Sequence, residues 1–312
     1  MPLAASRRRN SCDNHITMPT INYLDPKVLA RIRSLEIEAR GMVEGYLAGM
    51  HKSPYHGFAV EFAQHREYVP GDDIKHIDWK VYGRSERFYL KQYEQDTNLI
   101  CWLVVDASES MKYGSGDKTK YEYACLAAAS LAFLIVQQSD SAGLATFDSG
   151  VRDFLRPSSQ SSHLREIMTR LVQGPGGERT QVAATLHELA DRIERRGLIL
   201  LFSDLLDEPD EILTGLKHLR YQRHDLIVFH VLDAAEMDFP FQDSTLFRGL
   251  ERLPDLLTDP RSLRESYLEE LEKHLTELKK GCRAQHVDYV PMRTDKNVGV
   301  ALAAYLARRM RK

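Results

Sequence analysis

From residue 99 onward, short apolar runs alternate with longer segments in which apolar residues recur every three or four positions. Short continuous apolar runs are typical of strands covered on both faces, and the longer spacing is typical of amphipathic helices. The alternation predicts an α/β fold with a doubly wound, mostly parallel sheet. The predicted strands are residues 99–105, 142–147, 151–155, 198–202, 225–232 and 287–290; the predicted helices are 119–138, 163–171, 181–195, 208–220, 262–280 and 298–309; a β-hairpin is predicted over 245–257.

The first 97 residues differ in composition and in their pattern of apolar positions. Residues 1–19 are polar and aperiodic, which predicts a disordered leader. Asp25-Pro26 is a typical helix start, and the apolar positions behind it predict a helix to about residue 39. Glycine, aromatic and charged residues then prevail, with strand-like runs near 58–62 and 88–93. We therefore expect three parts: the leader, an N-terminal segment over 20–97, and an α/β domain over 98–312.

Composition narrows the class of protein. Hydrophobic residues make up 43% of the 312 residues and charged residues 28%, which excludes collagen, coiled coil and disorder along the whole chain. The 42 Lys+Arg and 45 Asp+Glu give a net charge of −3, so we expect no nucleic acid as the main partner. No apolar run approaches the roughly 20 residues that span a bilayer, and no signal peptide is evident. We expect a cytoplasmic protein with no membrane span.

Oxygen-bearing side chains follow the predicted strands at one edge of the sheet. Asp106, Ser108 and Ser110 come directly after the first buried strand, Thr180 precedes a predicted helix, and Asp204 follows strand 198–202. Ligands of such sheets gather at the carboxyl ends of the strands, and hard oxygen donors suit Mg²⁺ or Mn²⁺. The same residues could instead be ordinary helix caps and turn residues.

This set resembles the metal-ion-dependent adhesion site of von Willebrand factor type A domains. The resemblance implies that Ser108, Ser110 and Thr180 bind the metal, that Asp106 and Asp204 hold its waters, and that an acidic residue of a partner fills a vacant position. In this chain Leu205 stands where many adhesion domains have glycine. That departure leaves open whether Asp204 touches the metal or only its water, and whether Asp207 assists.

The segment before the predicted α/β domain points to a particular family. Residues 61–79 read EFAQHREYVPGDDIKHIDW. This is similar to the bacterial domain-of-unknown-function family 58, in which R-x-Y-x-P-G-D-D…I-D-W precedes an adhesion-type domain. The resemblance implies a family-specific segment over 20–97, a von Willebrand factor type A-like domain over 98–312, and a MoxR-type AAA+ ATPase as partner. The residues Asp72, Asp73, His76 and Asp78 could form a structural turn or a second metal site.

Two functions compete on these grounds. We expect a non-enzymatic, metal-dependent protein-interaction module, an adaptor or chaperone partner of a MoxR-type ATPase that also binds an acidic protein ligand. The alternative is a metal-dependent hydrolase in which the same ion activates water. No nucleophile–base pair is evident in the sequence near these loops, so no catalytic residue is assigned. A vestigial metal site in a structural protein is a third possibility, against which the complete set of five residues weighs.

Overall fold

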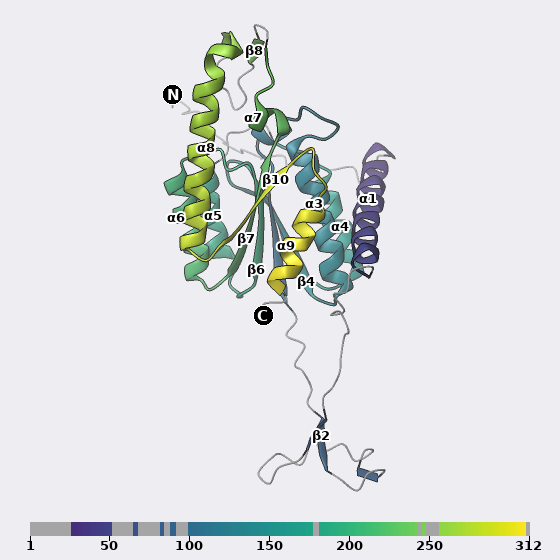
Figure 1. Cartoon of the computed structure of the whole chain (residues 1–312). Coiled ribbons are helices and arrows are strands. Elements are labelled where there is room, and N and C mark those ends of the chain that lie inside the picture. Colours follow the sequence, from purple (N-terminus) through teal and green to yellow (C-terminus); the bar gives the residue numbers. More distant parts are fainter. Residues whose placement is uncertain are drawn as a thin grey trace, which may run out of the picture.

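The apolar runs of the sequence form one six-stranded sheet in a computed structural model of the chain (Figure 1). The strands run in the order β10-β7-β6-β3-β4-β5, and every neighbouring pair is parallel except β4 and β5. This confirms the predicted doubly wound, mostly parallel sheet. The strands are β3 (Ile100–Asp106), β4 (Ser141–Phe147), β5 (Val151–Ser158), β6 (Leu198–Ser203), β7 (Asp225–Leu232) and β10 (Asp288–Arg293).

The structure describes residues 26–51, 65–67, 82–83, 88–91, 99–176, 181–242, 245–247 and 256–309. The predicted leader, the strand near 58–62 and the segment holding Asp72, Asp73, His76 and Asp78 lie outside these ranges. None of the described helices is long and apolar enough to cross a membrane.

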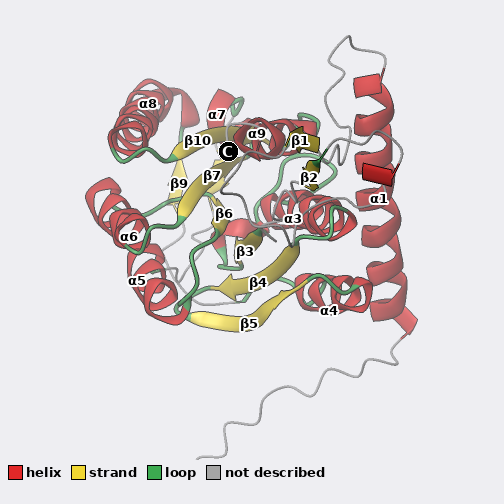
Figure 2. Cartoon of the chain, turned by 90° about the horizontal axis from the view of Figure 1, so that it is seen from below, coloured by secondary structure: helices red, strands yellow, loops and turns green. Residues whose placement is uncertain are grey.

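Helices cover both faces of the sheet (Figure 2). One face packs against α3, α4 and α9, with α1 packed on the outside of these helices, and the other face packs against α5, α6 and α8, so the sheet separates two hydrophobic cores. Strands β6 and β7 are buried along their whole length, which explains why they are continuous apolar runs. The helices are α1 (Pro26–His51), α3 (Lys120–Gln137), α4 (Ser161–Leu171), α5 (Val182–Arg192), α6 (Pro209–Tyr221), α7 (Ala234–Asp238), α8 (Pro260–Ala284) and α9 (Gly299–Arg309), with a 3-10 turn η2 (Ser110–Lys112).

Helix α1 is longer than predicted, because it continues past residue 39 to His51. Its buried positions Ile32, Ala39 and Val43 continue one helical face into the core shared with α3. A glycine in a helix costs about 1 kcal/mol relative to alanine, and this packing outweighs that cost at the glycines of α1. The helix thus packs on the sheet domain, while the predicted division at residues 97 and 98 stays a prediction.

Two small antiparallel sheets complete the described structure. β1 (His65–Glu67) pairs with β2 (Tyr89–Lys91), within the predicted strand near 88–93. β8 (Thr245–Phe247) pairs with β9 (Leu256–Thr258), which confirms the predicted hairpin over 245–257.

Candidate metal centre

Four of the five predicted metal-site residues lie at one edge of the sheet. Asp106 is the last residue of β3, Ser108 lies in the next loop, Ser110 begins η2, and Asp204 follows β6. Strands β3 and β6 are parallel neighbours with Val105 opposite Phe202, so their carboxyl ends coincide. All four side chains are buried.

Thr180, the fifth residue, lies outside the described residues. The chain on either side of it is close to the other loops of the site. The amide of Gly176 donates to the carbonyl of Ala107 at 2.6 Å, and the amide of Gln181 donates to the carbonyl of Asp148. The contact of Thr180 with a metal therefore stays a prediction.

The two serine hydroxyls have the spacing of neighbouring metal ligands. Ser108 Oγ and Ser110 Oγ are hydrogen-bonded to each other, 3.0 Å apart. Two adjacent ligands of an octahedral Mg²⁺, each about 2.0–2.1 Å from the ion, are about 2.9 Å apart. The hydroxyl pair and the two nearby carboxylates therefore fit a small, hard divalent cation.

Asp106 is held in one orientation by its neighbours. Its Oδ1 accepts a hydrogen bond from the amide of Ser108 at 3.0 Å, and its Oδ2 accepts one from Ser203 Oγ at 2.6 Å. Burial, together with repulsion from Asp204, raises the pKa of Asp106 from 3.8 to about 7 in spite of these hydrogen bonds. The carboxylate thus occupies a place where negative charge is poorly compensated.

A lysine that the sequence analysis did not single out also belongs to the site. Lys120, the first residue of α3, is fully buried, and its Nζ donates to Asp204 Oδ2 at 2.8 Å and to Glu236 Oε1 at 2.7 Å. Burial by itself lowers the pKa of the ammonium, but the two carboxylates outweigh burial and raise it above its ordinary value. Lys120 is therefore a permanent positive charge.

The second partner of Lys120 comes from the short helix α7. Asp233 and Glu236 form a reciprocal capping box at its start. Asp233 also accepts hydrogen bonds from Ser115 and Thr294, which tie α7 to the loop after η2 and to the end of β10. Burial raises the pKa of Glu236.

An apolar groove of about 450 Å³ lies beside Glu236. Its walls carry the aromatic rings of Tyr113, Phe239, Phe241 and Tyr267. Tyr113 also lies beneath the Lys120 ammonium, 6.0 Å from Nζ to the ring centroid. The ion pairs of Lys120 with Asp204 and Glu236 are therefore bordered by apolar side chains where they face this groove.

His230 positions the backbone of Asp204. Its Nε2 lies 2.7 Å from the carbonyl oxygen of Asp204, and its Nδ1 lies 2.6 Å from the hydroxyl of Tyr289. The carbonyl can only accept, so Nε2 carries the proton and Nδ1 accepts from the tyrosine. Burial lowers the pKa of His230 to about 4, so the imidazole is neutral.

Leu205 has the backbone conformation that favours glycine. Its φ is 48°, and its amide donates to Ser203 Oγ at 3.0 Å. The left-handed region explains why glycine is suited to this position, and the leucine adopts it because its side chain is buried in the core beneath α5 and α6. Asp207 accepts a hydrogen bond from the amide of Glu208 at the start of α6.

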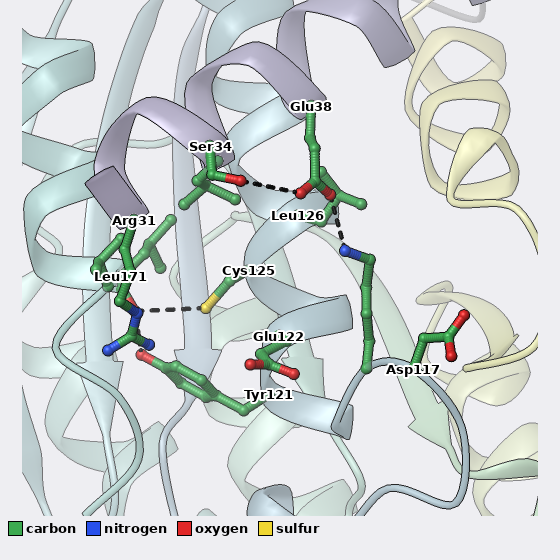
Figure 3. Close-up of a pocket in the computed structure, with 12 residues that line it drawn as sticks. Arg31, Ser34, Glu38, Asp117, Tyr121, Glu122, Cys125, Leu126 and Leu171 are labelled. Carbon is green, nitrogen blue, oxygen red and sulfur yellow. Dashed lines mark hydrogen bonds and ion pairs between the residues drawn. The ribbon is translucent and has the colours of Figure 1, made fainter. Parts of the chain in front are cut away.

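A separate cleft of about 230 Å³ lies between α1 and α3 (Figure 3). Glu38 of α1 faces it and pairs with Lys118 at 2.8 Å. Cys125 lies deeper, where its Sγ contacts the carbonyl of Leu171, and burial raises the pKa of the thiol to about 12. A thiol with so high a pKa is not a nucleophile at neutral pH, so the cysteine is structural.

The sequence profile of one family matches most of the described chain. Residues 64–277 match the family described as "Protein of unknown function DUF58". The chain belongs to the DUF58 family. This confirms the resemblance predicted from the motif over residues 61–79 and the strand–loop pattern behind it.

Two groups of proteins are similar to this DUF58 protein. "Uncharacterized protein Rv1480" of Mycobacterium tuberculosis and "Uncharacterized protein Mb1516" of Mycobacterium bovis are each 29% identical over 293 residues, which cover 92% of this chain and 91% of the relative. Among solved structures, "conserved hypothetical protein BatB from Bacteroides thetaiotaomicron" has 13% identity and a TM-score of 0.46, covering 69% of this chain and 100% of that one. The "SpRpn10 VWA domain" has 11% identity and a TM-score of 0.38, covering 65% and 93%.

Proposed function

We propose that this DUF58 protein is a metal-dependent protein-interaction module. Mg²⁺ or Mn²⁺ would be held by the hydroxyls of Ser108, Ser110 and Thr180, with Asp106 and Asp204 orienting its waters. The observation that carries the proposal is the 3.0 Å separation of the two serine hydroxyls beside two buried carboxylates. A bound ion there supplies an open coordination position that an acidic residue of a partner fills.

The charge of the site supports a divalent cation. Asp204 lies near Asp106, and Lys120 joins Asp204 to Glu236 and neutralises one of these three carboxylates. When the three carboxylates are ionised, two negative charges are left over in a buried place. Buried charges need partners, and a dication would balance this excess.

The arrangement of the hydroxyls favours binding over hydrolysis. Within the described ranges, Ser108 and Ser110 are hydrogen-bonded to each other and neither is hydrogen-bonded to an imidazole. His230, the buried histidine beside the site, is engaged with the backbone of Asp204 and with Tyr289. A nucleophile activated by a general base therefore has no support in this part of the chain.

Family membership supports the choice of partner. We propose a MoxR-type AAA+ ATPase, for which this protein would serve as an adaptor or chaperone partner. The proposal follows from the family resemblance given by the motif over residues 61–79 together with the DUF58 match.

A capture assay tests this function. The full chain is immobilised and offered a purified MoxR-type ATPase in Mn²⁺ or in EDTA, with Asp106→Ala and Asp207→Ala compared with wild type. We expect capture only in Mn²⁺, its loss in Asp106→Ala, and its retention in Asp207→Ala, because Asp207 accepts from the amide of Glu208 at the start of α6. Equal capture in EDTA, or by a folded Asp106→Ala variant, would contradict metal-dependent binding.

A further inference from the structure

We propose that Lys120 keeps the metal affinity of the site low, so that the cation is held firmly only when a partner carboxylate joins it. This inference rests on the proposed function, since it concerns the same site. It assigns a regulatory role to a residue outside the predicted ligand set.

The ammonium of Lys120 competes for a carboxylate that the metal needs. Lys120 Nζ is 2.8 Å from Asp204 Oδ2, and the two side chains are 1% and 2% exposed. A fully buried lysine is rare and needs carboxylate partners. One oxygen of Asp204 is therefore committed to an internal cation before any metal arrives.

Lys120 is fixed in this position by a second ion pair. Glu236 Oε1 accepts from Nζ at 2.7 Å, and Glu236 is itself held by the capping box of α7. Because both of its carboxylate partners are held in place, the ammonium of Lys120 cannot move aside to make room for a dication. Two cations must then share the field of one carboxylate, which weakens the binding of the second.

A partner carboxylate would restore the metal affinity that Lys120 lowers. It adds a negative charge and an oxygen ligand to the site. Metal and partner then bind cooperatively, and by linkage each raises the affinity for the other by the same factor. A site with all its carboxylates free would instead hold the metal permanently and give no such coupling.

Charge-matched variants separate this role from a purely structural one. Lys120→Met combined with Glu236→Gln removes one positive and one negative charge, so the total charge is unchanged while Asp204 is released. Glu236→Gln alone leaves Lys120 to Asp204, and glutamine retains the capping-box geometry. Lys118→Met is the control, since this lysine pairs with Glu38 at 2.8 Å on the surface of α1.

Calorimetric titration of the full-length variants with Mn²⁺ gives the readout, after far-ultraviolet circular dichroism has shown that each is folded. We expect the double variant to bind at least about tenfold more tightly than wild type, Glu236→Gln to bind several-fold more weakly, and Lys118→Met to match wild type. Added acetate, as a stand-in for a partner carboxylate, should strengthen binding to wild type more than to the double variant.

Equal affinity of wild type and the double variant would overturn the role of Lys120 and leave the metal site intact. If the double variant does not fold, an unchanged affinity of Glu236→Gln overturns the role on its own. Absence of Mn²⁺ binding in all variants, with and without acetate, would overturn the proposed function as well.

Discussion

Replacing Asp106 with asparagine should change the pH dependence of stability in a metal-free solution. Asp106 is fully buried, and burial together with Asp204 raises its pKa from 3.8 to about 7. Between these two values the folded protein holds a proton that the unfolded chain has released. The stability contributed by the protonated carboxyl is therefore present at low pH and is lost as the pH rises through 7.

The magnitude follows from the two pKa values. A rise from 3.8 to about 7 corresponds to a total of about 4 kcal/mol, of which about 2 to 3 kcal/mol falls between pH 5 and pH 8. Asparagine carries no charge at any of these pH values, and its amide oxygen can still accept from the amide of Ser108. The stability of Asp106→Asn relative to wild type should therefore increase by that amount from pH 5 to pH 8.

Urea denaturation in EDTA at pH 5, 6, 7 and 8 measures this difference. Most other titrating groups are common to both proteins, so the difference between them reports Asp106 together with its electrostatic coupling to Asp204. A difference that stays constant across this range, whatever its sign, would refute the conclusion that Asp106 is held in an electrostatically unfavourable place.

Four further substitutions, at three positions, test the packing of the fold and are followed by thermal unfolding. Leu205→Gly and Leu205→Ala both lose a buried side chain, which should lower the stability by about 2–5 kcal/mol. Because glycine relieves the positive φ, the glycine variant should be the more stable of the two by about 1 kcal/mol. A higher melting temperature for the alanine variant would contradict this. Gly215→Ala should destabilise by about 1–3 kcal/mol, because an added Cβ would lie 2.8 Å from Leu186 Cβ between α6 and α5, and an unchanged melting temperature would show that the helices separate freely. Val43→Ala should destabilise by about 1–2 kcal/mol if the extended half of α1 packs against α3; no loss would mean that this half contributes nothing.

The sheet could be predicted from sequence because its strands are buried on both faces. Continuous apolar runs such as those of β6 and β7 have few other interpretations when helices separate them. Strand order also placed Asp106 and Asp204 at one edge, since parallel neighbours end together. The start of α3 was equally readable, because Thr119 forms a capping box with Glu122.

The full length of α1 and the presence of α7 could not be predicted from the sequence, because neither leaves a clear local signal. Helix α1 runs past its glycines because Val43 packs into the core, and local propensity does not contain that contact. Helix α7 has five residues, too few for a periodic signal, although Asp233 and Glu236 have the spacing of a capping box.

Lys120 did leave a signal that could have been read. A positive charge in the first turn of a helix is disfavoured by the helix dipole, so a lysine there is favoured when a carboxylate lies nearby. Its partners Asp204 and Glu236 are 84 and 116 residues away in sequence, and only the fold brings them together.

Titration of the protein with Mn²⁺ by calorimetry, wild type beside Ser108→Ala, tests the central claim most directly. Ser130→Ala is the matched control, because Ser130 is a buried serine whose hydroxyl donates to the carbonyl of Leu126 within α3. With acetate present to supply a carboxylate, we expect saturable binding by wild type and Ser130→Ala and a loss of at least about a hundredfold in Ser108→Ala. Binding that survives in Ser108→Ala, or its absence in wild type, would contradict a cation site built on the serine hydroxyls.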